Sequence, residues 1–182
     1  MHDAAEKGDV KTVKRLLAYG ADVDARTTWT DPYAHNADDR PFGECPPDHG
    51  FTPLHFAAGS GYTEVMKLLL AKKAKVDARS FHGYTPLHWA AESGRTEVAE
   101  FLLSHRAEIK ARDKDGATPL HMAVSAYHNK DIVQLLLIHG AKVNTKDNSG
   151  RTPLHVAVLS YYEGAVAEFP SDCAKPTKGS MP

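Results

Sequence analysis

Apolar and polar positions along this chain follow a pattern that restarts every 33 or 34 residues. Each period contains a short apolar segment with a small Ala, a Gly linker or polar break, an acidic residue and, in the first three copies, a run of three apolar residues. The start of each period is marked by the tetrapeptide Thr-Pro-Leu-His, at 52–55, 85–88, 118–121 and 152–155. Self-similarity at this spacing predicts a stack of repeated helical units.

Each part of the repeated unit has a local structural role. A Gly two positions before the tetrapeptide permits a turn with positive φ, and the Thr is suited to cap the first helix. Pro at the next position loses no hydrogen bond, because the N–H at the start of a helix has no partner within it. The acidic residue favours the start of a second helix, where the helix dipole is positive. The predicted unit is therefore helix, turn, helix and projecting hairpin.

These motifs and their spacing closely resemble the ankyrin repeat. The resemblance covers residues 1–27 and 47–169, and it implies an all-α repeat solenoid with short β-hairpin-like projecting loops. It also implies a concave face, formed by the hairpins and inner helices, that binds other proteins. In this family each motif His forms a hydrogen bond near its own Thr and stabilises the loop between repeats. The residues expected to do so are Thr52, His55, Thr85, His88, Thr118, His121, Thr152 and His155.

The phase of the repeat divides the chain into seven segments. They are a partial repeat that caps the N-terminus (1–27), an inserted finger loop (28–49), three repeats (50–79, 80–112 and 113–146), a truncated repeat (147–169) and a flexible tail (170–182). The last repeat is predicted to have a shortened second helix, because Pro170 stands where the preceding repeat has Leu136. Lys73 and Arg106 replace the Gly that ends the second helix in other units, which predicts a left-handed residue costing about 1 kcal/mol at each position.

The finger at 28–49 adds twenty residues to one hairpin. Residues 28–48 hold five acidic side chains against Arg40, a net charge of −4. Trp29, Tyr33 and Phe42 lie among several prolines. Such loops are usually functional or disordered, and both interpretations remain open here.

Overall charge and composition exclude several classes of function. The formal net charge is −1, so no global field attracts nucleic acid or anionic lipid. The sequence contains no apolar stretch near twenty residues, and its two cysteines, Cys45 and Cys173, cannot build a disulfide framework. We expect a monomeric protein inside the cell, in the cytoplasm or nucleus, with no membrane or nucleic-acid partner.

Catalytic and metal chemistry have little support in the sequence. His35, Cys45 and His49 lie near acidic residues in the finger, but they lack the tight ligand pairs of a structural zinc site. No motif for a nucleophilic serine, a phosphate loop or a dinucleotide is present. We therefore predict no enzyme activity, no cofactor and no metal.

Partner binding is predicted near the finger. Phe51, Phe81 and Tyr84 occupy turn positions that are expected to be exposed, whereas Phe56 and Trp89 are expected in the core. A cationic column at one repeat position either favours an acidic ligand or is ordinary for such repeats; it consists of Arg26, Arg79, Arg112 and Lys146. The predicted partner-binding residues are Phe51, Phe81, Tyr84, Arg79, Arg112, Trp29, Tyr33 and Phe42.

The sequence thus predicts a protein–protein interaction module, a scaffold or adaptor, whose partner has an acidic or mixed apolar and acidic surface. An alternative is a regulatory or inhibitory subunit whose acidic finger masks the cationic column. A more remote alternative is a metal-dependent activity in the finger. The repeat determines the scaffold and leaves the identity of the partner to the variable surface.

Overall fold

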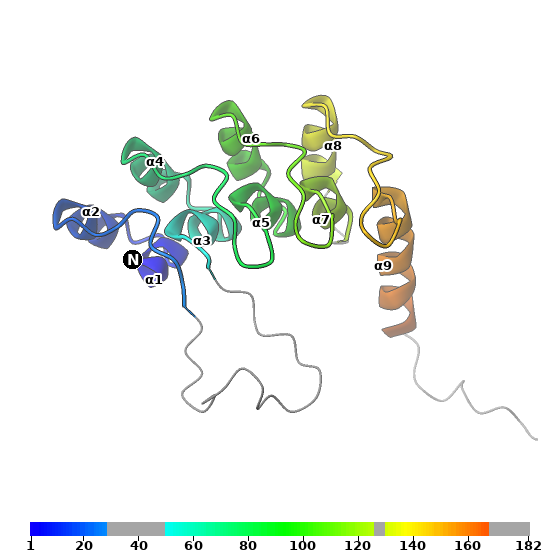
Figure 1. The fold of residues 1–182 in the computed structure, drawn as a ribbon, viewed down its shortest axis with the longest axis horizontal. Coiled ribbons are helices and arrows are strands. Elements are labelled where there is room, and N and C mark those ends of the chain that lie inside the picture. The colour runs from blue at the N-terminus through cyan, green and yellow to red at the C-terminus, as the bar shows by residue number, and fades with distance from the viewer. Residues whose placement is uncertain (29–49, 126–129, 168–182) are drawn as a thin grey trace, which may run out of the picture.

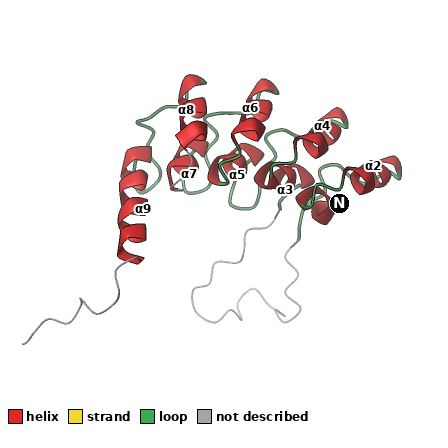
Figure 2. Ribbon diagram, turned by 180° about the vertical axis from the view of Figure 1, so that it is seen from behind, coloured by secondary structure: helices red, strands yellow, loops and turns green. Residues whose placement is uncertain are grey.

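The protein is a row of helix pairs (Figure 1). The computed structural model describes residues 1–28, 50–125 and 130–167, with side chains through Ser160. These residues form helices joined by loops (Figure 2). The helices are α1 (His2–Glu6), α2 (Val10–Ala18), α3 (Pro53–Ser60), α4 (Thr63–Ala71), α5 (Pro86–Glu92), α6 (Thr96–Ser104), α7 (Pro119–Ser125), α8 (Lys130–Ile138) and α9 (Pro153–Ala167).

The helices form two levels. Inner helices α1, α3, α5, α7 and α9 contact one another in sequence order, and each of the first four also contacts the outer helix that follows it. Figure 1 shows the outer helices α2, α4, α6 and α8 above them. The predicted repeat solenoid is confirmed by this arrangement.

Small side chains allow the inner helices to pack closely. Ala57, Ala58, Ala90 and Ala91 are completely buried between units. The motif Leu of each of the first three units and the buried Leu and Ile side chains of α4, α6 and α8 fill the remaining space. Burying such a side chain contributes roughly 2 kcal/mol. The fully buried large aliphatic side chains include Leu54, Leu69, Leu87, Leu102, Ile132 and Leu136.

The motif histidines connect neighbouring units. Nδ1 of His55 accepts a hydrogen bond from the backbone N–H of Thr52 at 3.1 Å. A backbone N–H can only donate, so Nδ1 is unprotonated and Nε2 carries the hydrogen of the neutral ring. Nε2 then donates to the carbonyl oxygen of Tyr84 in the next unit at 2.9 Å. The structural role implied by the family resemblance is confirmed.

The same connection recurs along the stack. Nε2 of His88 lies 3.3 Å from the carbonyl oxygen of Ala117, and Nε2 of His121 lies 3.2 Å from that of Arg151. Each of these rings is buried within the inner layer. Every link therefore joins the start of one inner helix to the turn that precedes the next.

The projecting turns contain two backbone hydrogen bonds and no assigned strand. In the turn at 80–84, Ser80 N–H donates to the Tyr84 carbonyl at 2.9 Å and Gly83 N–H donates to the Ser80 carbonyl at 3.0 Å. Gly83 has φ of +87°, which a residue with a Cβ rarely adopts. Adjacent tips are joined as well, because Lys114 N–H donates to the His82 carbonyl at 2.8 Å. The turns form a continuous ridge along one edge of the stack.

The last unit differs from the predicted helix, turn and shortened helix. Its α9 runs without interruption from Pro153 to Ala167. In earlier units Gly61 and Gly94 lie between the inner and outer helices with positive φ. The corresponding position in the repeat is Tyr161, and here the chain stays in the helix, so the predicted turn is wrong. The tail at 170–182 lies outside the described residues.

The two substitutions for a helix-ending Gly adopt the predicted left-handed conformation. Lys73 has φ of 68° and Arg106 has φ of 66°. Gly20 and Gly140 have positive φ at the same position and leave open space where a Cβ would stand. The free-energy cost at Lys73 and Arg106 therefore comes from the left-handed backbone conformation and not from a steric clash between the side chain and a neighbour.

Replacing Lys73 with Gly should stabilise the protein by about 0.5–1 kcal/mol, because relief of the left-handed strain exceeds the entropy that Gly adds to the unfolded chain. Chemical denaturation measures the change. The adjacent Lys72 has φ of −92°, so Lys72→Gly should lower stability. Equal effects at the two positions would contradict this explanation.

Stability should fall between pH 6.5 and 4 because of His88. Burial lowers the pKa of this imidazole to about 4. Over this range the unfolded chain binds the proton and the folded chain does not, so the free energy of unfolding decreases as pH falls, by about 3 kcal/mol at most. Denaturation at several pH values should show a weaker pH dependence for His88→Asn, whose carbonyl oxygen still accepts a hydrogen bond but does not titrate. The same pH dependence in both proteins would show that His88 is not responsible.

Candidate protein-binding surface

The residue after each Thr-Pro-Leu-His motif is apolar in all four units. These residues, which we call the groove row, are half-buried on successive inner helices, in contrast to the motif Leu, which is buried in the first three units. The groove row consists of Phe56, Trp89, Met122 and Val156. Phe56 and Met122 pack against the core while keeping part of their surface exposed. The expectation that Phe56 and Trp89 are simply core residues is therefore incomplete.

Aromatic rings gather at the N-terminal end of this row. The Phe51 and Trp89 ring centroids lie 4.4 Å apart, and the Phe56 and Trp89 centroids lie 5.5 Å apart at 76°. His2 contacts Phe56 edge-to-face at 5.6 Å. Each such pair adds about 0.5–1.5 kcal/mol beyond the area it buries, so the cluster presents a rigid aromatic surface from three units.

Phe51 is a support for this surface and not an exposed ring. Its side chain is only 9% exposed, and the expected exposure was wrong because Trp89 of the next unit lies against it. The ring also contacts Phe56 at 5.9 Å and His55 at 5.4 Å. Phe51 would be exposed at the turn of an isolated unit, but in the stack Trp89 of the next unit covers it.

Phe81 and Tyr84 lie in two other environments. Phe81 is 46% exposed at a turn tip, as expected, and the Lys114 Nζ atom lies 3.6 Å from its ring centroid. This contact places a cation over an aromatic face at the ridge. Tyr84 is half-buried and contacts the His88 ring edge-to-face at 6.0 Å. The three predicted aromatic anchors do not form one patch.

The cationic column forms an ordered ladder. Arg26 Nη1 donates to the Arg79 carbonyl at 2.6 Å, Arg79 Nη1 to the Arg112 carbonyl at 2.6 Å, and Arg112 Nη2 to the Lys146 carbonyl at 2.7 Å. These bonds hold the guanidinium groups in a row and leave their charge in place. Arg79 also lies 3.6 Å from Glu108. The sequence showed the column of charge but not the carbonyl partners, because these come from the next unit.

The two ends of the finger are joined at the first turn. Thr27 N–H donates to the Phe51 carbonyl, and Gly50 N–H donates to the Thr27 carbonyl, both at 2.9 Å. The same pair of bonds closes the two-residue tip between Ser80 and Gly83. The finger thus begins and ends on the base of an ordinary turn. Trp29, Tyr33 and Phe42 lie outside the described residues, as do the metal candidates His35, Cys45 and His49.

Comparison with known proteins identifies the family. The family described as ankyrin repeats, in three copies, matches residues 1–113 and 106–169. This chain belongs to the ankyrin-repeat family. Protein binding is the typical role of ankyrin repeats.

Curated relatives share part of this ankyrin stack. Protein phosphatase 1 regulatory subunit 27 from Homo sapiens and its counterpart from Mus musculus are each 36% identical to the chain over 78 residues. The match covers 43% of this chain, and the chain spans 38% of the length of these relatives.

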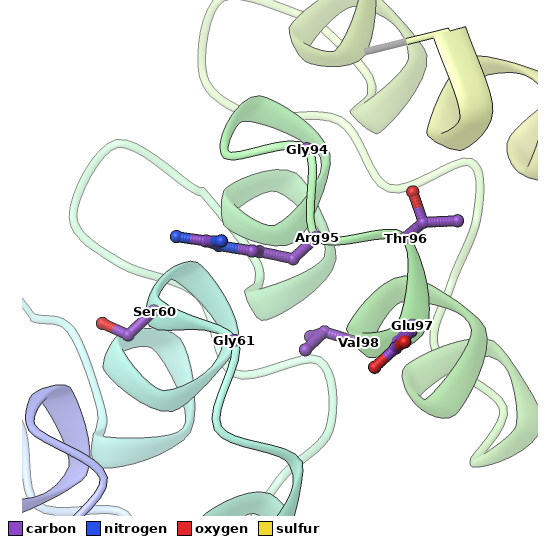
Figure 3. A pocket seen from close by; sticks show the side chains of 7 residues that line it. All are labelled: Ser60, Gly61, Gly94, Arg95, Thr96, Glu97 and Val98. Atoms are coloured by element: carbon purple, nitrogen blue, oxygen red, sulfur yellow. The ribbon is translucent and has the colours of Figure 1, made fainter. Parts of the chain in front are cut away.

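A polar hollow of about 340 Å³ lies between the second and third units of the ankyrin stack (Figure 3). Arg95 extends along its wall and donates through Nε to the Gly59 carbonyl at 3.1 Å. A similar hollow occurs one unit earlier, where the ring of Tyr62 lies over Gly8. This recurrence identifies a packing feature of the repeat. The lining residues are Ser60, Gly61, Gly94, Arg95, Thr96, Glu97 and Val98.

The described parts of the chain offer neither a metal site nor a membrane-spanning helix. There, no group of three or more His, Cys, Asp and Glu side chains is arranged to hold a metal ion. None of the helices in the same parts is both long and apolar enough to cross a membrane.

Gly59→Ala should displace Trp89 from the groove row. A Cβ at residue 59 would lie 2.7 Å from Cε3 of Trp89, so the ring must move toward solvent. Ala would otherwise stabilise a helix by about 0.5–1 kcal/mol relative to Gly, and we expect this gain to be lost. In a Trp29→Phe background, quenching and a red shift of Trp89 fluorescence measure the displacement. Ser60→Ala is the control, and unchanged emission in Gly59→Ala would contradict the packing.

Proposed function

We propose that this chain is a protein–protein interaction module, a scaffold or adaptor, that binds its partner on the face of the inner helices and projecting turns. The observation that carries the proposal is the groove row of apolar side chains beside an ordered ladder of guanidinium groups. Both features run across the units, so they suit an extended partner surface. The family and the regulatory-subunit name of the relatives support a role without catalysis, inside the cell in the cytoplasm or nucleus.

The proposed partner has apolar and acidic groups. Arg79 and Arg112 each retain N–H donors beyond those used in the ladder, since a guanidinium has five. Their fixed positions reduce the entropy lost when a carboxylate binds. Phe81 and Tyr84 would contact apolar groups of the partner, and Phe51 would hold Trp89 in place from beneath. The finger residues Trp29, Tyr33 and Phe42 would set specificity.

A regulatory role is the second candidate. The relatives are named as a regulatory subunit of protein phosphatase 1, and the base of the acidic finger lies beside the ladder. Arg26 Nη1 donates to the Gly50 carbonyl at 3.3 Å as well as to Arg79. In this form of the proposal the finger covers the ladder until a partner displaces it.

Substitutions on the proposed surface should weaken binding to a partner isolated by affinity capture with the intact chain. We expect Phe81→Ala, Tyr84→Ala, Arg79→Ala and Arg112→Ala each to reduce affinity about tenfold or more, as is typical of anchor residues. Isothermal titration calorimetry measures the losses, and thermal unfolding checks that each variant folds. Lys67→Ala is the control, because this exposed cation pairs with Glu64 on the outer helix α4. Losses no larger than that of the control would contradict the site.

Deletion of residues 29–48 distinguishes the two candidate roles in the same assay. Stronger binding of an acidic peptide after the deletion would support masking of the ladder. Weaker binding would identify the finger as a direct contact.

A further inference from the structure

The last described unit of the stack exposes the motif Leu that earlier units bury. Leu154 is 71% exposed, whereas its counterparts Leu54 and Leu87 in the same motif position are completely buried. Six large exposed apolar side chains lie on α8, α9 and the loop between them: Leu137, Ile138, Val143, Leu154, Val158 and Leu159. Exposed apolar surface concentrated in one place is typical of a protein interface.

An apolar groove of about 330 Å³ lies among α7, α8 and α9. Its walls include Leu120, Val133, Leu137 and Leu154. Between earlier units, successive outer helices pack against each other, as α6 does with α8. In the described part of the last unit no outer helix follows, because α9 continues and its C-terminal half extends away from α8 (Figure 1). No described outer helix of the last unit therefore covers the groove.

A second apolar surface on α9 is continuous with this groove. It includes His155, Val158 and Leu159, and it shares Leu154 with the groove. Residues 154, 155, 158 and 159 recur at helical spacing and form one exposed face of α9. The groove and this face, which we call the end face, make a single surface.

The end face carries no unpaired formal charge among its described residues at neutral pH. Arg151 Nε lies 2.7 Å from Asp147 Oδ2, and the Arg151 backbone N–H also donates to Asp147. Burial raises the pKa of the Asp147 carboxyl, but these hydrogen bonds outweigh burial and hold the pKa below its usual value. Nδ1 of His155 is already bonded to Thr152. A charged partner would find no opposite charge here, whereas two identical neutral faces can meet without repulsion.

The opposite end of the stack is unsuited to cover the end face. There α2 exposes Lys11, Lys14 and Arg15, and burying these cations against apolar side chains would cost more than their packing returns. Head-to-tail stacking of copies is therefore disfavoured. A tail-to-tail arrangement with two-fold symmetry brings only the two end faces together.

We propose that the protein forms a tail-to-tail dimer, in which the exposed face of α9 packs on α9 of a second copy and each α9 helps to cover the other copy's groove. The dimer replaces the monomer expected from the sequence and is independent of the proposed partner site.

Sedimentation equilibrium over about a hundredfold range of concentration tests the proposal with the intact chain. We expect the mass to rise from 19.9 kDa toward twice that value. Val158→Glu combined with Leu159→Glu should raise the dissociation constant more than tenfold, because four carboxylates would meet in an apolar interface. Tyr19→Glu is the control, since Tyr19 is 84% exposed at the other end of the stack. A single-chain mass throughout, or an unchanged dimer in the double variant, would overturn the proposal.

Cross-linking gives a test that does not depend on a disruptive substitution. In a Cys45→Ser and Cys173→Ser background, Val158→Cys should form a disulfide-linked dimer on mild oxidation, and Tyr19→Cys should not. Cross-linking through Tyr19→Cys with none through Val158→Cys would show that copies associate elsewhere and would also overturn the proposal.

Discussion

The second, third and fourth units of the stack are each tied to the next by the hydrogen bond from a motif histidine to the carbonyl of the following turn. One ring both accepts at Nδ1 from the N-terminus of its own helix and donates at Nε2 across the interface, so helix capping and stacking depend on the same side chain. The Ala residues between inner helices make this reach possible because they let the helices approach closely. A unit that lost its neighbour would leave a donor without its partner and a Leu uncovered, as Leu154 shows at the end of the row.

A second set of hydrogen bonds, those of the ladder, also joins successive units along the edge formed by the projecting turns. Arg26, Arg79 and Arg112 each bond a carbonyl of the next unit, which offsets the repulsion of stacked cations while preserving their charge. The same arginine side chains thus join neighbouring units and carry the positive charge proposed to bind an acidic partner. The finger begins and ends at the base of the first turn, where Arg26 of the ladder donates to the Gly50 carbonyl.

The two ends of the stack differ in chemistry. At the N-terminal end α2 presents a charged outer surface, which is what a terminal repeat requires to remain exposed to water. At the other end, the uninterrupted α9 leaves the apolar groove without an outer helix. Among the described residues, the absence of a helix break in the last unit therefore leaves exposed a packing surface that earlier units bury.

The sequence by itself determined the repeat, the helix pairs, the histidine motif and the left-handed residues Lys73 and Arg106, because each of these depends on spacing or on a residue's own backbone preference. It also located the finger and the charged column. Only the tertiary structure decided that Phe51 is covered by Trp89, that the column is bonded to carbonyl groups, and that α9 continues past the expected turn. The physical reason is that burial and hydrogen-bond partners at these positions come from a neighbouring unit some 33 residues away, whereas sequence patterns report mainly on the unit in which a residue lies.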